Sequence, residues 1–286
     1  MIWKPRTFFL VGVMALQVLG WPQASEAFPA MSAKTLGKML DWAIDSVDDL
    51  YRWWVRSDVP LPKKRIPAPK PLAAGTRRVP CPLSKSQIKD LADLPVAEAG
   101  KRLGRMNLSL PELEQVYLRI LATQKKISSA QADDLLHHLG GVEGFVSTLR
   151  KASSSNSAQA AGHLFELETA RAAKKQGYTV LAIGRKYADP AKKGLTDLDL
   201  FFEKNGKKYF VEAKSYEDVS WSSLPNFRAD MDSLQAASDL FGSGEKVFII
   251  RNKPTDDRIL RALNEAARSR NVVLVFGSPE NVLNLI

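Results

Sequence analysis

The chain of 286 residues is poor in cysteine and histidine, with one of the first and three of the second. Because Cys81 is alone, no intrachain disulfide can form, and an exported form of the protein must be stabilised by its core. His137 and His138 have no cysteine or histidine partners at zinc-binding spacing, so we do not expect them to hold a metal. These shortages exclude a disulfide-stabilised scaffold and a histidine–cysteine zinc site.

Acidic residues are absent before Glu26, and residues 1–27 have the order of a secretory signal peptide. A basic start precedes the apolar residues 8–19, and Ser25 and Ala27 are small residues where a signal peptidase cleaves. The apolar run is shorter than the about 20 residues of a membrane helix, so no stable membrane span is expected. We predict cleavage after Ala27 and a secreted or periplasmic protein. An uncleaved anchor and a mitochondrial presequence are the alternatives.

The middle of the chain divides into three segments. Residues 28–57 contain apolar residues at helical spacing, which predicts an amphipathic helix that packs on the protein or on a partner. Residues 58–83 are rich in proline and basic residues and are expected to form an extended linker. Residues 84–152 predict a small helical region, because Ser84, Ser109 and Ser128 are each followed three positions later by glutamine or glutamate. A serine-rich stretch at residues 153–157 separates this region from the C-terminal domain.

Residues 158–286 alternate between helical and strand patterns, which predicts an α/β fold with a mixed sheet flanked by helices. The expected order is a helix at 162–178, a strand at 179–183, a β-hairpin at 196–215, a helix around 228–241, a strand at 246–250, a helix at 255–268 and a strand at 271–276.

The hairpin is defined by Asn205 and Gly206, because Asn-Gly between two β-prone runs favours a two-residue turn. Such a turn places Asp199 opposite Glu212 and Asp197 opposite Lys214. Since side chains alternate along a strand, these four residues share one face of the hairpin. The other face carries the apolar residues Leu198, Leu200, Phe202, Tyr209, Val211 and Ala213.

Carboxylates opposite each other, such as Asp199 and Glu212, have Cβ atoms about 4.5–5.5 Å apart and repel each other. A hard cation such as Mg²⁺, with oxygen ligands at about 2.0–2.1 Å, would relieve this repulsion. The hairpin therefore predicts a site for Mg²⁺, with Mn²⁺ as a substitute. The ordinary alternative is a half-buried hairpin whose charged face is solvated.

The sequence Asp199, then Glu212-Ala213-Lys214, resembles the signature of the PD-(D/E)xK nucleases, which have the restriction-endonuclease-like fold. Gly162, Phe165-Glu166 and Gly177-Tyr178 are similar to the preceding helix of the Holliday-junction-resolvase-like members. The proline that often precedes the family's aspartate is replaced by Leu198. The resemblance covers residues 158–286.

The resemblance implies Mg²⁺-dependent hydrolysis of phosphodiester bonds, with Asp199, Glu212, Glu166 and the Ala213 carbonyl as metal ligands. Lys214 would position or deprotonate the attacking water. Glu168 is the competitor of Glu166. Asp197 is either a second ligand or a salt-bridge partner of Lys214, and Gln235 matches an accessory glutamine or is an ordinary surface residue.

The expected partner is nucleic acid, DNA before RNA, in keeping with a net charge of +10. The basic residues just before the hairpin either contact phosphates or only solubilise a loop; they are Arg185, Lys186, Lys192 and Lys193. An export signal, a proline-rich linker and a terminal nuclease together resemble secreted bacterial polymorphic toxins, which implies an immunity protein as a second partner. A nuclease for scavenging or defence, and a non-catalytic binding or scaffold module of the cell envelope, are the alternatives.

Overall fold

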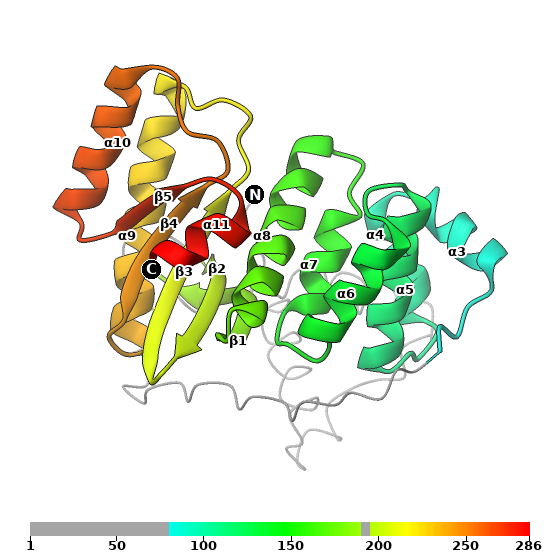
Figure 1. Ribbon diagram of the computed structural model, residues 1–286. Helices are drawn as coiled ribbons and strands as arrows, with labels where there is room; N and C mark the ends of the chain where they lie inside the picture. The colour runs from blue at the N-terminus through cyan, green and yellow to red at the C-terminus, as the bar shows by residue number, and fades with distance from the viewer. Residues whose placement is uncertain (1–79, 190–194) are drawn as a thin grey trace, which may run out of the picture. The chain divides into compact units, whose positions relative to one another are not determined.

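The computed structural model describes residues 80–189 and 195–286 (Figure 1). The predicted signal peptide, the amphipathic helix and the linker up to residue 79 lie outside these ranges. Lys192 and Lys193 also lie outside them.

The predicted helical region is confirmed as five helices, α3 (Lys85–Ala92), α4 (Val96–Gly104), α5 (Leu110–Thr123), α6 (Ser129–Leu139) and α7 (Phe145–Ala152). Three of them begin with the expected capping box. Ser84, Ser109 and Ser128 are the N-cap residues of α3, α5 and α6, each with a reciprocal bond to the glutamine or glutamate three positions on. These boxes satisfy backbone N–H groups that a helix start otherwise leaves unpaired.

The C-terminal part contains α8 (Ser157–Lys175), β1 (Thr179–Ala188), β2 (Leu195–Lys204), β3 (Lys207–Lys214), α9 (Leu224–Phe241), β4 (Glu245–Ile250), α10 (Asp257–Ser269), β5 (Val273–Phe276) and α11 (Pro279–Val282). Short 3₁₀ turns, η1 (Trp221–Ser223) and η2 (Leu283–Leu285), precede α9 and follow α11. The strands form one sheet in chain order; β1, β2 and β3 are antiparallel, and β3, β4 and β5 are parallel. The predicted mixed sheet flanked by helices is confirmed.

Helices cover both faces of this sheet (Figure 1). Helices α9 and α10 pack on one face, over a cluster that includes Phe201, Phe210 and Phe248. Two successive crossovers in the same direction and of the same hand place their helices on the same face. Helix α8 and the N-terminal helices pack on the other face, over a cluster that includes Phe202 and Val211.

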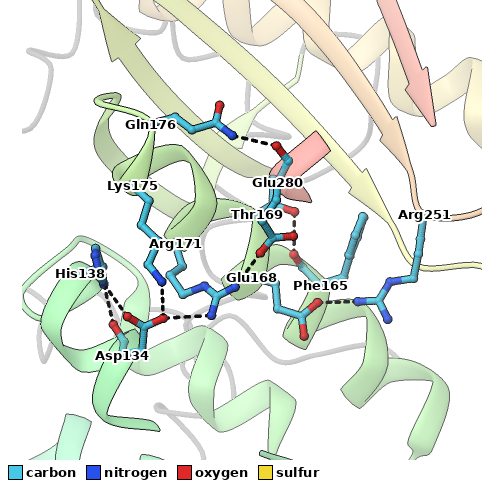
Figure 2. Close-up of polar contacts among 10 residues, drawn as sticks. All are labelled: Asp134, His138, Phe165, Glu168, Thr169, Arg171, Lys175, Gln176, Arg251 and Glu280. Atoms are coloured by element: carbon cyan, nitrogen blue, oxygen red, sulfur yellow. Dashed lines mark hydrogen bonds and ion pairs between the residues drawn. The ribbon is translucent and has the colours of Figure 1, made fainter. Parts of the chain in front are cut away.

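The helical region and the sheet share this second cluster, which runs from Ile88 in α3 to Val275 in β5 without a break at residues 153–157. The junction is close: the Ile183 amide of β1 donates to the Glu143 carbonyl at 2.9 Å. A Cβ atom on Gly144 would lie 1.8 Å from the Ile183 carbonyl oxygen. On α8, Arg171 bonds to Asp134 of α6 and Glu280 of α11 (Figure 2).

The hairpin has the predicted turn and register. Asn205 and Gly206 have φ values of 54° and 75°, as a type I′ turn requires. The strands pair in the predicted register from Lys204–Lys207 to Leu200–Val211. The predicted pairs of Asp199 with Glu212 and of Asp197 with Lys214 lie beyond these paired residues.

The prediction for Leu198 was wrong. Leu198 lies in the cluster under α9 and α10, whereas Leu200, Phe202 and the apolar residues of β3 that were assigned to its face lie in the other cluster. Residues 198 and 200 would share a face in a regular strand. The alternation of β2 therefore breaks at Asp199. On β1, Ile183 pairs with Leu200 and Arg185 with Leu198, but Gly184 between them forms no pair with Asp199.

No helix in residues 80–189 and 195–286 combines the length and the apolar character needed to span a membrane.

Candidate active site

The candidate site lies where β2 and β3 run past α8. The Asp199 carboxylate of β2 accepts a hydrogen bond from the backbone N–H of Ala213 at 3.0 Å. Glu212 and Lys214, on either side of Ala213, stand at the carboxyl end of β3. Glu212 is buried, with 6% of its surface exposed. The buried carboxylate contradicts the alternative of a solvated charged face.

Glu166 of α8 is the second buried acid of the site, with 7% of its surface exposed. Its Oε1 lies 2.9 Å from Nδ1 of His163, one helical turn earlier. Burial raises the pKa of Glu166 to about 7, and the charge of Asp199 contributes to the rise, while His163 and Lys151 oppose it. Glu166 and Asp199, which come from a helix and a strand, are therefore electrostatic neighbours.

Glu212 has the same neighbour. Burial raises the pKa of Glu212 well above its ordinary value, and Asp199 adds to this shift, while Lys214 opposes it. Asp199 thus interacts with both buried acids. Asp199 of β2 therefore repels the carboxyl group of α8 and that of β3, which is costly where solvent is excluded.

Lys214 lies between two carboxylates. Its ammonium is 2.5 Å from Glu212 Oε1 and 3.0 Å from Oδ2 of Asp230 in α9. Burial lowers the pKa of Lys214, but Glu212, Asp199 and Asp230 outweigh burial, so that the pKa is raised well above the usual lysine value. The lysine is therefore held as an ammonium ion.

Asp197 does not pair with Lys214 as predicted. Its carboxylate lies 2.9 Å from Lys151 of α7. The formed ladder between β2 and β3 ends at Leu200–Val211, so the two strands do not pair as far as Asp197. Asp197 instead connects the helical region to the sheet.

The two accessory candidates on helices, Glu168 and Gln235, bond to residues outside the candidate site. Glu168 forms an ion pair at 2.6 Å with Arg251, whose guanidinium stacks on Phe165 at 4.5 Å (Figure 2). Gln235 accepts from Lys246 and donates to Asp239 at 2.7 Å. Lys246 is near the start of β4, whereas Lys214 pairs with the end of that strand. Gln235 is therefore remote from Lys214, as the surface alternative predicted.

The predicted basic loop is in part a strand. Arg185 and Lys186 belong to β1, which extends five residues beyond the predicted end. The Arg185 guanidinium stacks on Phe241 at 4.7 Å and lies 3.5 Å from Glu143, with 12% of its side chain exposed. Such a buried and paired cation is a poor phosphate contact. Lys186 is exposed on the strand.

The donor set fits a hard cation in its chemistry, because Glu166, Asp199 and Glu212 supply carboxylate oxygens and Asp199 repels each of the other two. As they lie, no three His, Cys, Asp or Glu side chains in residues 80–189 and 195–286 are grouped to hold a metal ion. Lys214 bonds to Glu212, and the Ala213 amide bonds to Asp199. A cation would have to compete with these internal donors.

Sequence reasoning missed Asp230, Lys151 and His163. The spacing of His163 and Glu166, three residues apart on one helix, was a usable signal. No sequence signal indicated Asp230, because it reaches Lys214 only through the packing of α9 on β3.

Helix α9 is itself fixed to β1 by buried polar contacts. The Tyr187 hydroxyl donates to the Ser233 carbonyl at 2.6 Å, and the Ser233 hydroxyl donates to Asp189 at 3.0 Å. Ser233 lies one turn beyond Asp230, so these bonds help to position Asp230 beside Lys214.

No protein-family model, no curated protein and no solved structure matches this chain.

Proposed function

We propose that the protein is a metal-dependent nuclease of the restriction-endonuclease-like kind, which hydrolyses phosphodiester bonds of nucleic acid, DNA before RNA. The observation that carries the proposal is that Asp199 accepts a hydrogen bond from the Ala213 amide, which lies between the buried Glu212 and the Lys214 ammonium. The buried Glu166 of α8 is the electrostatic neighbour of Asp199. The antiparallel β1–β2–β3 unit preceded by a helix that bears a buried acid supports the resemblance on which the proposal rests.

In this proposal Asp199, Glu212 and Glu166 hold the cation, with the Ala213 carbonyl as a further oxygen donor. Mg²⁺, when bound, would lower the pKa of a water molecule and neutralise charge on the phosphate. Lys214 orients the attacking water and stabilises the negative charge that develops on the phosphate oxygens. The burial of Glu166 and Glu212 excludes bulk water, which strengthens each of these interactions.

The test is cleavage of plasmid DNA and of RNA by the purified full chain in Mg²⁺, with and without EDTA. We expect cleavage that EDTA abolishes, that Glu212→Gln removes, and that Lys214→Met slows by about 10²- to 10³-fold. Glu217→Gln, an equal charge change in the exposed loop after β3, serves as the control. Cleavage that resists EDTA, or that persists in Glu212→Gln, would contradict the proposal.

The second candidate is a non-catalytic binding or scaffold module. The observation that favours it is the internal pairing of Lys214 with Glu212 and Asp230, which neutralises charge without a metal. A module of this kind would cleave neither DNA nor RNA and would unfold more readily when Lys214 is replaced by methionine, since that change leaves buried carboxylates unpaired.

We place the nuclease outside the cell that makes it, as a toxin with an immunity partner, because of the signal-like start and the proline-rich linker. Both segments lie outside the described residues. Cytoplasmic production of residues 28–286 should then arrest growth, and Glu212→Gln should restore it. Equal growth arrest by both proteins would remove the toxin role, and active cleavage without growth arrest would favour scavenging or defence.

A further inference from the structure

Lys214 has two resting partners from different elements. Glu212 is two residues away on the same strand, whereas Asp230 comes from α9. The side chains of Lys214, Glu212 and Asp230 are 21%, 8% and 25% exposed. Glu212 is thus the more buried of the two acids, and Asp230 stands nearer to solvent.

A divalent cation at Glu212 and the Lys214 ammonium compete for the same carboxylate. Two positive charges a few ångströms apart repel strongly where water is excluded. The ammonium must therefore leave Glu212 when the cation binds. Lysine has a flexible stem and three donor hydrogens, so Lys214 can turn from one acceptor to another without a change in β3.

Asp230 lies where it can accept the Lys214 ammonium that leaves Glu212. The neighbouring residues Phe227, Met231 and Leu234 of α9 are buried against the sheet. Tyr187 of β1 and Asp189, which follows β1, both bond to Ser233 of α9. Asp230 is therefore a carboxylate on a fixed backbone, 3.0 Å from the Lys214 ammonium before any cation arrives.

We propose that Asp230 is a positioning residue that holds Lys214 when a divalent cation occupies Glu212, so that the lysine stays at the site without blocking it. This inference rests on the proposed function. It assigns a role to a residue that lies outside the Asp…Glu-x-Lys sequence.

The first test is the binding of Mn²⁺ to the full chain, titrated by electron paramagnetic resonance without nucleic acid. Asp230→Asn should weaken binding by about tenfold, which corresponds to about 1.4 kcal/mol, and Asp230→Glu should restore it. Asp232→Asn is the matched control, because Asp232 lies on the same helix, is 57% exposed and pairs with Arg270. Its Mn²⁺ affinity should equal that of the wild type. Equal affinities of Asp230→Asn and Asp232→Asn would overturn the inference.

A double-mutant cycle with Lys214→Met shows whether Asp230 acts through the lysine. Lys214→Met should bind Mn²⁺ more tightly than the wild type, since the competing ammonium is gone. In that background, Asp230→Asn should change the affinity by less than about twofold. An equal loss in both backgrounds would mean that Asp230 acts directly on the cation, contrary to the inference.

The same titrations separate this inference from the proposed function. A wild-type chain that binds Mn²⁺ and cleaves nucleic acid, with no effect of Asp230→Asn on Mn²⁺ affinity, removes only the role of Asp230. A wild-type chain that neither binds Mn²⁺ nor cleaves removes the proposed function and the role of Asp230 together.

Discussion

Glu166 and Glu168 are separated by one residue on α8, but their side chains have different partners. Glu166 is buried beside His163 and interacts with Asp199 of β2. The Glu168 side chain is 38% exposed and pairs with Arg251 (Figure 2). Residues two apart on a helix do not share a face. Only Glu166 faces the candidate site.

This difference predicts unequal effects of the same substitution. Glu166→Gln should reduce Mg²⁺-dependent cleavage by at least about 10²-fold, because an acid that interacts with Asp199 is lost. Glu168→Gln should leave cleavage within about threefold of the wild type, since it removes only a partly exposed ion pair. Initial rates of plasmid cleavage measure both, and the reverse order of effects would exclude Glu166 as the acid of the site.

Glu166 also predicts a pH dependence of stability in the metal-free protein. Its pKa is raised from an ordinary 4.5 to about 7 in the folded state. Between these values the folded protein retains a proton that the unfolded chain has lost, so the free energy of unfolding falls as pH rises. The loss of unfolding free energy caused by Glu166 is complete above about pH 7 and amounts to about 3 kcal/mol.

Urea unfolding of the wild type and Glu166→Gln in EDTA, at intervals from pH 4.5 to 8, measures this effect. The free energy of unfolding of Glu166→Gln should exceed that of the wild type by an amount that grows through this window. Glu212 is present in both proteins, so the difference reports on Glu166. A constant difference at all pH values would show that Glu166 is not titrating there.

Gly144 predicts how tightly the helical region is joined to the sheet. Its φ is +82°, and an added Cβ would overlap the Ile183 carbonyl oxygen. Gly144→Ala should therefore lower the free energy of unfolding by more than about 2 kcal/mol. Gly162→Ala is the control, because Gly162 lies within α8 and its added Cβ would meet nothing within 4 Å. Removing a helical glycine should stabilise the protein by about 0.5–1 kcal/mol. Chemical denaturation measures both, and equal stabilities of the two variants would contradict the close junction.

Local chemistry allowed much of the fold to be predicted. The three capping boxes and the Asn205-Gly206 turn depend on residues a few positions apart, and each is formed as expected. The turn also set the register of the hairpin as far as Leu200 and Val211. For these features, sequence spacing and spatial proximity are nearly the same thing.

The parts that could not be predicted depend on distant elements. Leu198 was assigned to the wrong face because the alternation of β2 breaks at Asp199, beside β1. Arg185 is buried by Phe241, which belongs to a helix more than fifty positions later in the chain. Asp197 meets Lys151 for the same kind of reason. Such contacts follow from tertiary packing, which periodicity in one segment does not describe.

The order of the strands has a consequence for synthesis. Because β1 to β5 lie side by side in the order in which a ribosome makes them, each new strand finds its partner already at the growing edge of the sheet. Glu166, Asp199 and Glu212 are all translated before α9, so Asp199 can meet each of the other two acids in a nascent chain that still lacks Asp230. The repulsion of Asp199 by Glu166 and by Glu212 would then act on the nascent chain before α9 arrives and Asp230 pairs with Lys214.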